Sequence, residues 1–147
     1  MFGSILLPID IANRSSWEYA LPQAIELATA GSGIVTAMTV VRELKVMFEG
    51  VYLEIQLERI VAEAKAKLAE IVSGYGAGVV PVRQDVRVGS IGSQIIAAAR
   101  DHRADLIVMA SHRPEMSDYL IGPNAAHVAR HATCSVLVLR RFSEPPP

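Results

Sequence analysis

The chain has 147 residues, with 14 lysines and arginines against 15 aspartates and glutamates and a formal net charge of −1. This length is usual for one domain, and the balanced charge provides no basic field for nucleic acid. Apolar residues make up 51% of the chain, but charged residues or glycine interrupt every apolar run before it reaches the length of a membrane span. We therefore expect a protein that is not embedded in a membrane.

Short apolar runs alternate with longer amphipathic segments along the chain. The apolar runs predict strands at residues 4–9, 34–41, 79–88, 105–110 and 135–140. Apolar residues at helical spacing predict helices at residues 15–30, 52–72 and 90–102, with a fourth helix beginning beside Gly122. The alternation predicts an α/β fold, a three-layer sandwich in which right-handed crossovers place helices on both faces of a five-stranded parallel sheet.

The first predicted helix contains two conflicting signals. Ser15 and Glu18 have the spacing of a capping box, which predicts that the helix begins there. Pro22 follows inside the predicted helix, where proline removes a backbone hydrogen bond to the previous turn. We therefore expect either a kink or a later start.

No linker or internal repeat divides the chain, so we expect one domain at residues 1–142. Residues 143–147 contain three prolines and no apolar partner, which predicts a disordered tail. The first ten residues have neither the basic nor the apolar segment of a secretory signal. Cys134 is the one cysteine, which excludes an intrachain disulfide and fits a reducing cytoplasm.

Residues 105–140 are the most informative part of the sequence. They read as a buried strand, a polar loop, a helix and a second buried strand, which places a helix N-terminus at the mouth of a parallel sheet. The unpaired N–H groups and partial positive charge of a helix start can bind phosphate without a metal. Pro123 suits the first helical position, and we expect the N–H groups of Asn124, Ala125 and Ala126 to face such an anion.

Other common phosphate sites are excluded. The chain has no G-x-x-x-x-G-K-[ST] motif, and its glycines do not form a G-x-G-x-x-G motif after a strand. A phospho-receiver domain would need clustered acids after the first strand, an acid after the third and a lysine after the last. Of these required residues the chain has only Asp10, so a phospho-receiver domain is not indicated.

The chain resembles the universal stress proteins from residue 5 to residue 140. The resemblance is carried by ILLPID at 5–10, the long charged helix, VRVG at 86–89, DLIVMASHR at 105–113 and GPNAAHVARHATCSVLVLR at 122–140. It implies an adenine-nucleotide alpha-hydrolase-like fold. The loop sequence ASHRP, followed by YL-x-G-x-N, is similar to the subset of the family that binds ATP, so the resemblance implies ATP, ADP or AMP as the ligand, with or without Mg²⁺.

The phosphate motif of that subset is Gly-x2-Gly-x9-Gly-Ser/Thr, and the chain departs from it. Ala110 and Arg113 occupy the first two glycine positions, the spacing to Gly122 is one residue shorter, and Pro123 replaces the hydroxyl residue. Arg113 could either pair with a phosphate or fill the pocket. Pro123 brings neither an N–H nor a hydroxyl, and Asn124 could restore one donor.

The resemblance implies a nucleotide site at the strand ends and at the start of the last helix. The site residues are Pro8, Ile9, Asp10, Val40, Gly89, Met109, Ala110, His112, Arg113, Gly122, Pro123, Asn124 and Ala125. Asp10 could accept hydrogen bonds from ribose or adenine, or could instead form a turn or cap a helix. His112 could contact phosphate or ribose, or could hold its own loop by a hydrogen bond.

The other polar candidates have simpler structural interpretations. His127 and His131 lie four residues apart, but no carboxylate or cysteine at suitable spacing completes a metal site. We expect His131 to support the helix C-terminus and Cys134 to pack in the core. No nucleophile-elbow sequence surrounds Ser111, so no catalytic residue is assigned.

The favoured function is a cytoplasmic stress-response protein that binds ATP and acts as a dimeric sensor or modulator. One alternative is a slow ATPase or autokinase that uses the same pocket, and another is a ligand-free interaction protein whose site Arg113 and Pro123 close. If the apolar strand from Ser135 to Arg140 ends the sheet, it predicts pairing with a second copy, and the resemblance also implies a dimer there. No residue specifies a further protein partner.

Overall fold

The computed structural model describes residues 1–42, 50–75, 80–111 and 122–140, with the backbone alone at residues 50–55. The predicted tail at 143–147 lies outside the described residues. In chain order the elements are β1 (Ser4–Pro8), η1 (Arg14–Ser16, one 3₁₀ turn), α1 (Ala20–Ala30), β2 (Ile34–Arg42), α2 (Gly50–Ser73), β3 (Val82–Gly89), α3 (Ile91–Asp101), β4 (Leu106–Ala110), α4 (Pro123–His131) and β5 (Ser135–Leu139).

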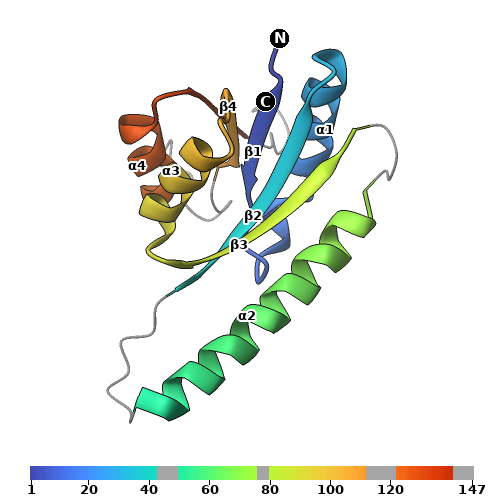
Figure 1. Ribbon diagram of the computed structural model, residues 1–147. Helices are drawn as coiled ribbons and strands as arrows, with labels where there is room; N and C mark the ends of the chain where they lie inside the picture. Colours follow the sequence, from blue (N-terminus) through green and yellow to red (C-terminus); the bar gives the residue numbers. More distant parts are fainter. Residues whose placement is uncertain (43–49, 76–79, 112–121, 141–147) are drawn as a thin grey trace, which may run out of the picture.

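The five strands form one parallel sheet in the order β3-β2-β1-β4-β5. β1 lies at the centre, and β3 and β5 are the two edges. Helices α1 and α2 cover one face of the sheet, and α3 and α4 cover the other (Figure 1). The predicted three-layer α/β sandwich is therefore confirmed.

Alternate side chains of the central strand enter two apolar layers, one on each face of the sheet. Ile5 and Leu7 join the layer beneath α1 and α2, whereas Leu6 joins Ile95 of α3 and Val128 of α4 in the other. These five side chains are at most 1% exposed. A strand buried on both faces needs apolar residues at every position, which explains its continuous apolar sequence.

Helix α1 begins later than the capping-box pattern predicts. Asn13 caps the short η1 turn by accepting the N–H of Ser15 at 3.3 Å, and α1 starts only at Ala20. Pro22 therefore lies in the first turn, where a missing N–H removes no helical hydrogen bond. The predicted start at Ser15 is wrong, and the later start expected from Pro22 is confirmed.

Helix α2 is the longest element, with 24 residues, and it runs along β3 in Figure 1. Leu68 and Ile71 are buried against the sheet, whereas the ion pair between Arg59 and Glu63 lies on the exposed face. Neither α2 nor any other helix in the described part of the chain is long and apolar enough to cross a membrane.

The carboxylate of Asp105 ties the beginning of β4 to the beginning of β1. The N–H groups of Gly3 and Ser4 donate to its two oxygens at 2.8 and 3.1 Å. The backbone N–H of Asp105 donates in return to the carbonyl of Ser4 at 2.9 Å. The two strands are thus fixed to each other at their amino ends.

The carboxyl ends of the same two strands are less tightly paired. β1 pairs with β2 from Ser4 to Pro8, but it pairs with β4 only at Ile5 and Leu6. Pro8 has no N–H to donate to a ladder. The strand order reverses between β1 and β4, and the carboxyl end of such a switch point is where open α/β sheets place their ligand crevices.

Candidate functional site

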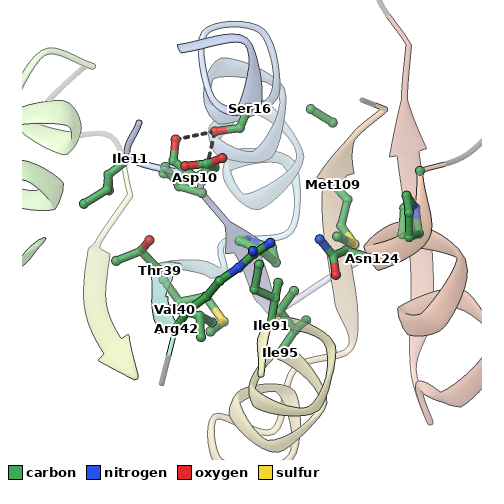
Figure 2. A pocket seen from close by; sticks show the side chains of 17 residues that line it. Asp10, Ile11, Ser16, Thr39, Val40, Arg42, Ile91, Ile95, Met109 and Asn124 are labelled. Atoms are coloured by element: carbon green, nitrogen blue, oxygen red, sulfur yellow. Dashed lines mark hydrogen bonds between the residues drawn. The ribbon is translucent and has the colours of Figure 1, made fainter. Parts of the chain in front are cut away.

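A cavity of about 370 Å³ opens at the carboxyl ends of β1, β2 and β4, beside the N-termini of α3 and α4 (Figure 2). Its volume is in the range of small-molecule sites in proteins. The lining residues are Pro8, Ile9, Asp10, Ile11, Ser16, Met38, Thr39, Val40, Arg42, Ile91, Ile95, Met109, Ala110, Gly122, Pro123, Asn124 and Ala125. The structure thus brings together every predicted site residue that it describes except Gly89, while His112 and Arg113 lie outside the described residues.

Gly89 ends β3 and is absent from the cavity wall. Its φ of 146° is a conformation that other residues rarely adopt, and an added Cβ would lie 2.9 Å from Nε2 of Gln94. Glycine is therefore needed for the turn from β3 into α3. This structural role accounts for the glycine without a ligand, and the place of Gly89 in the site stays a prediction.

Asp10 combines the two roles that the sequence left open, because it forms a turn and also lines the cavity. Its Oδ1 accepts the N–H of Ala12 at 3.0 Å. The Ser16 hydroxyl fixes the backbone of Asp10, since its oxygen accepts the Asp10 N–H at 2.9 Å and donates to the Asp10 carbonyl at 3.0 Å (Figure 2). These contacts hold a carboxylate at the edge of the cavity.

Apolar side chains from three elements form much of the cavity wall. Met38 of β2, Ile95 of α3 and Met109 of β4 are at most 7% exposed and belong to the same apolar layer. Val40 packs against this layer from β2. Such a wall suits a flat, weakly polar group such as a nucleobase.

Thr39 brings a buried hydroxyl to this wall. The residue is 4% exposed, lines the cavity, and lies between Asp10 and Val40 in Figure 2. No hydrogen bond joins its side chain to any other residue that the structure describes, and its oxygen is not sealed from solvent. The hydroxyl is therefore available to a ligand as a donor or an acceptor.

Helix α4 presents its first turn to the cavity. Pro123 is the first helical residue, as predicted, and the preceding Gly122 has an extended backbone. The N–H of Ala126 donates to the carbonyl of Gly122 at 2.9 Å, so the prediction that this N–H faces an anion is wrong. The N–H groups of Asn124 and Ala125 precede the first helical hydrogen bond and are the ones that can face a ligand.

Several lining residues were not predicted from the sequence, namely Ile11, Ser16, Met38, Thr39, Arg42, Ile91 and Ile95. Arg42 is the last residue of β2, which extends one residue beyond its predicted end. The strand-end rule would have found Thr39 and Arg42 if it had been applied to residues on both sides of Val40. No local signal identifies the α3 residues, because the packing of that helix brings them to the cavity.

The described residues offer little reactive chemistry. They contain no cluster of three His, Cys, Asp or Glu side chains that could hold a metal ion. The rings of His127 and His131 lie 4.6 Å apart, with His131 in the last turn of α4. Burial raises the pKa of the Cys134 thiol, and the side chain packs against the core, which makes it a poor nucleophile.

The model of the universal stress protein family matches residues 1–140. The chain belongs to this family. Among curated relatives of this universal stress protein, universal stress protein G of Shigella flexneri is 28% identical over 143 residues, covering 95% of this chain and 100% of that protein. The family resemblance inferred from the motifs is confirmed.

Solved structures of universal stress proteins share the fold. UspA from Lactobacillus plantarum matches with a TM-score of 0.77 and 22% identity, covering 94% of this chain and 97% of that one. A universal stress protein from Arabidopsis thaliana with AMP bound has a TM-score of 0.64, 16% identity and coverage of 96% and 93%. Another, in complex with cAMP, has a TM-score of 0.61, 20% identity and coverage of 95% and 97%.

Proposed function

We propose that this universal stress protein is a cytoplasmic stress-response regulator that binds an adenine nucleotide, ATP in particular, in the cavity between Asp10 and the start of α4. The observation that carries this proposal is the convergence of an apolar wall, a carboxylate and a helix N-terminus on one cavity at the sheet's switch point. Each of these features complements a different part of a nucleotide.

The base and sugar are matched by the part of the cavity nearest β1 and β2. The wall formed by Met38, Val40 and Ile95 can cover an adenine face. Asp10 and Thr39 lie beside it and can bond to ribose hydroxyls or to the adenine amine. Because Oδ1 of Asp10 already accepts the N–H of Ala12, Oδ2 is the oxygen that remains available to a ligand.

The phosphates are matched by the first turn of α4. The N–H groups of Asn124 and Ala125 and the helix dipole favour a negative group there. Two structural neighbours, one with AMP bound and one in complex with cAMP, support the adenine-nucleotide class. ATP is proposed from the loop sequence at residues 110–124, with Mg²⁺ accompanying the phosphates if it is needed.

Binding without rapid turnover is the simpler activity for this site. Phosphoryl transfer needs a positioned base and groups that clamp the developing charge. Asp10 is the one carboxylate among the described lining residues, and it already takes part in a turn. A regulator that changes its contacts when nucleotide binds fits these residues better than an ATPase or autokinase.

We also propose that the protein acts as a homodimer joined through β5. This strand is an edge of the sheet, and its residues Val136 to Leu139 are half-buried and apolar. An unpaired edge of this kind can be covered by the same edge of a second copy. In this proposal a further protein would bind the dimer differently when nucleotide occupies the cavity.

The proposal is tested by mass spectrometry of small molecules released from protein purified without added nucleotide, followed by calorimetric titration with ATP, ADP and AMP. A retained or titrating adenine nucleotide supports binding. ADP that accumulates with turnover would favour the enzyme, and an empty protein that responds to none of the three would favour the ligand-free alternative.

A matched variant tests the role of Asp10. Asp10→Asn keeps a side-chain oxygen for the N–H of Ala12, so the turn is retained while the charge is lost. We expect adenine-nucleotide affinity to fall by roughly 10-fold, because a charged acceptor is replaced by a neutral one. Unchanged affinity would remove Asp10 from the binding site.

A further inference from the structure

The cavity has a positively charged side chain, Arg42, at the end of β2. Among the lining residues that the structure describes, Asp10 and Arg42 alone carry charge. In Figure 2 the side chain of Arg42 extends from the end of β2 into the cavity, in the direction of Asn124. Arg42 is also exposed to solvent, so its guanidinium lies at the open side of the cavity, where an entering ligand can reach it.

The Arg42 guanidinium has no partner among the described residues. It forms no salt bridge with Asp10 and no hydrogen bond with any described group. By contrast, the guanidinium of Arg87 on the neighbouring strand β3 is paired through two nitrogens. Its Nε lies 2.8 Å from Asp85 and its Nη1 lies 2.9 Å from Asp101. No described residue therefore occupies the donors of Arg42, and they can bind an anion that enters the cavity.

We propose that Arg42 recognises the phosphate of the ligand and makes the cavity select adenine nucleotides over uncharged adenosine. This inference rests on the proposed function and names the residue that sets its charge specificity. A guanidinium presents paired N–H donors that fit phosphate oxygens two at a time.

Arg42 also explains how a site with an altered phosphate motif can still hold an anion. Pro123 stands where the ATP-binding motif has a hydroxyl residue, and it contributes neither a hydroxyl nor an N–H. A charged donor on β2 replaces those neutral donors from the other side of the cavity. The phosphate would then lie between Arg42 and the N–H groups of Asn124 and Ala125.

The test is calorimetric titration of adenosine, AMP and ATP into the full chain and into three variants. In Arg42→Gln we expect the affinity for AMP and ATP to fall roughly 10- to 100-fold, as for loss of a charge-assisted hydrogen bond, and the affinity for adenosine to change less than about 2-fold. Arg42→Lys keeps the positive charge but loses the paired N–H donors of the guanidinium, so its loss of AMP and ATP affinity should be intermediate.

Arg83→Gln is the matched control. Arg83 is exposed near the amino end of β3, away from the cavity, so this variant removes the same charge and should leave all three affinities unchanged. Unchanged AMP affinity in Arg42→Gln would overturn the inference. An equal loss for adenosine would also overturn it, because the guanidinium would then contact the base or the sugar.

Failure of the proposed function has a different outcome. If the wild-type protein binds no adenine compound, that function fails, and titration with inorganic pyrophosphate decides the role of Arg42. Binding that is present in the wild type and lost in Arg42→Gln would preserve anion recognition by Arg42. No binding, or equal binding by both proteins, would overturn it, and thermal unfolding would show that both are folded.

Discussion

The imidazole Nε2 of His102 lies 2.7 Å from Oδ2 of Asp85 and joins the C-terminal end of α3 to the edge strand β3. The same carboxylate oxygen accepts a hydrogen bond from Nε of Arg87 at 2.8 Å. Burial raises the pKa of Asp85, but the hydrogen bonds and charges of His102 and Arg87 outweigh it, so its pKa is lowered overall. The contact between Asp85 and His102 therefore holds the C-terminal end of α3 against the edge strand β3.

The lowered pKa predicts a specific loss of stability in acid. The Asp85 carboxylate stabilises the fold above its unfolded pKa, which for an aspartate is ordinarily 3.8, and the contribution disappears as the pH falls through the lower folded pKa. Asp85→Asn should reduce the free energy of unfolding at neutral pH by on the order of 1–3 kcal/mol. It should also flatten the decline of that free energy below about pH 4.

Urea unfolding followed by circular dichroism at neutral pH and at about pH 3 measures both effects. Asp101→Asn is the control, since the Asp101 side chain is 61% exposed and its pairing with Arg87 is expected to contribute less. The same acid dependence in the wild type and in Asp85→Asn would contradict the prediction.

Gly89→Ala should destabilise the protein by about 1–3 kcal/mol, because the φ of 146° becomes strained once a Cβ is present. Gly74→Ala is a suitable comparison, since its Cβ would make an ordinary 3.5 Å contact with the carbonyl of Ile71. Thermal unfolding measures the difference. Nucleotide affinity of the folded Gly89→Ala protein should be retained, and equal melting temperatures for the two variants would refute the structural role of Gly89.

Thr39→Val should weaken adenine-nucleotide binding by roughly 3- to 10-fold, as expected for the loss of one neutral hydrogen bond. The change is nearly isosteric, and no described residue loses a hydrogen bond, so stability should not fall. Thr36→Val is the control, because Thr36 is 2% exposed on the same strand but does not line the cavity. Calorimetry showing equal affinities for the two variants would exclude Thr39 from the ligand contacts.

Charge introduced at Val136 or Val138 of β5 should convert a dimer into monomers or aggregates in size-exclusion chromatography. Gln84→Lys provides the control, since it adds a charge at an exposed position of the opposite edge strand, β3. A circular dichroism spectrum would establish that each variant is folded. An unchanged dimer in the β5 variants would refute assembly through this strand.

The order of the elements was predictable because β1, β2, β4 and β5 are largely apolar runs, β3 mixes valines with polar residues, and the helices have apolar residues at helical spacing. The start of α1 was not, because Ser15 and Glu18 give only a local signal. Asn13 competes as the cap of a separate turn, and Pro22 is compatible with a helix only near its beginning. Local patterns cannot rank such competing starts.

The site was predictable where it depends on strand ends, as for Asp10, Met109 and Ala110. Ile91 and Ile95 could not be placed, because their position depends on the packing of α3 across the sheet. The contact between Asp85 and His102, which are 17 residues apart, likewise forms only once β3 and α3 have packed. Non-local packing of this kind leaves no periodic trace in a single sequence.

The cavity takes its strand residues from β1, β2 and β4, which are all internal to the sheet, and none of its described lining residues belongs to the edge strands β3 and β5. Mutations that accumulate on the two edges during evolution can therefore alter which chains the sheet joins without touching the walls of the cavity. Paralogues built on this frame can diverge in assembly while they keep a common small-molecule chemistry.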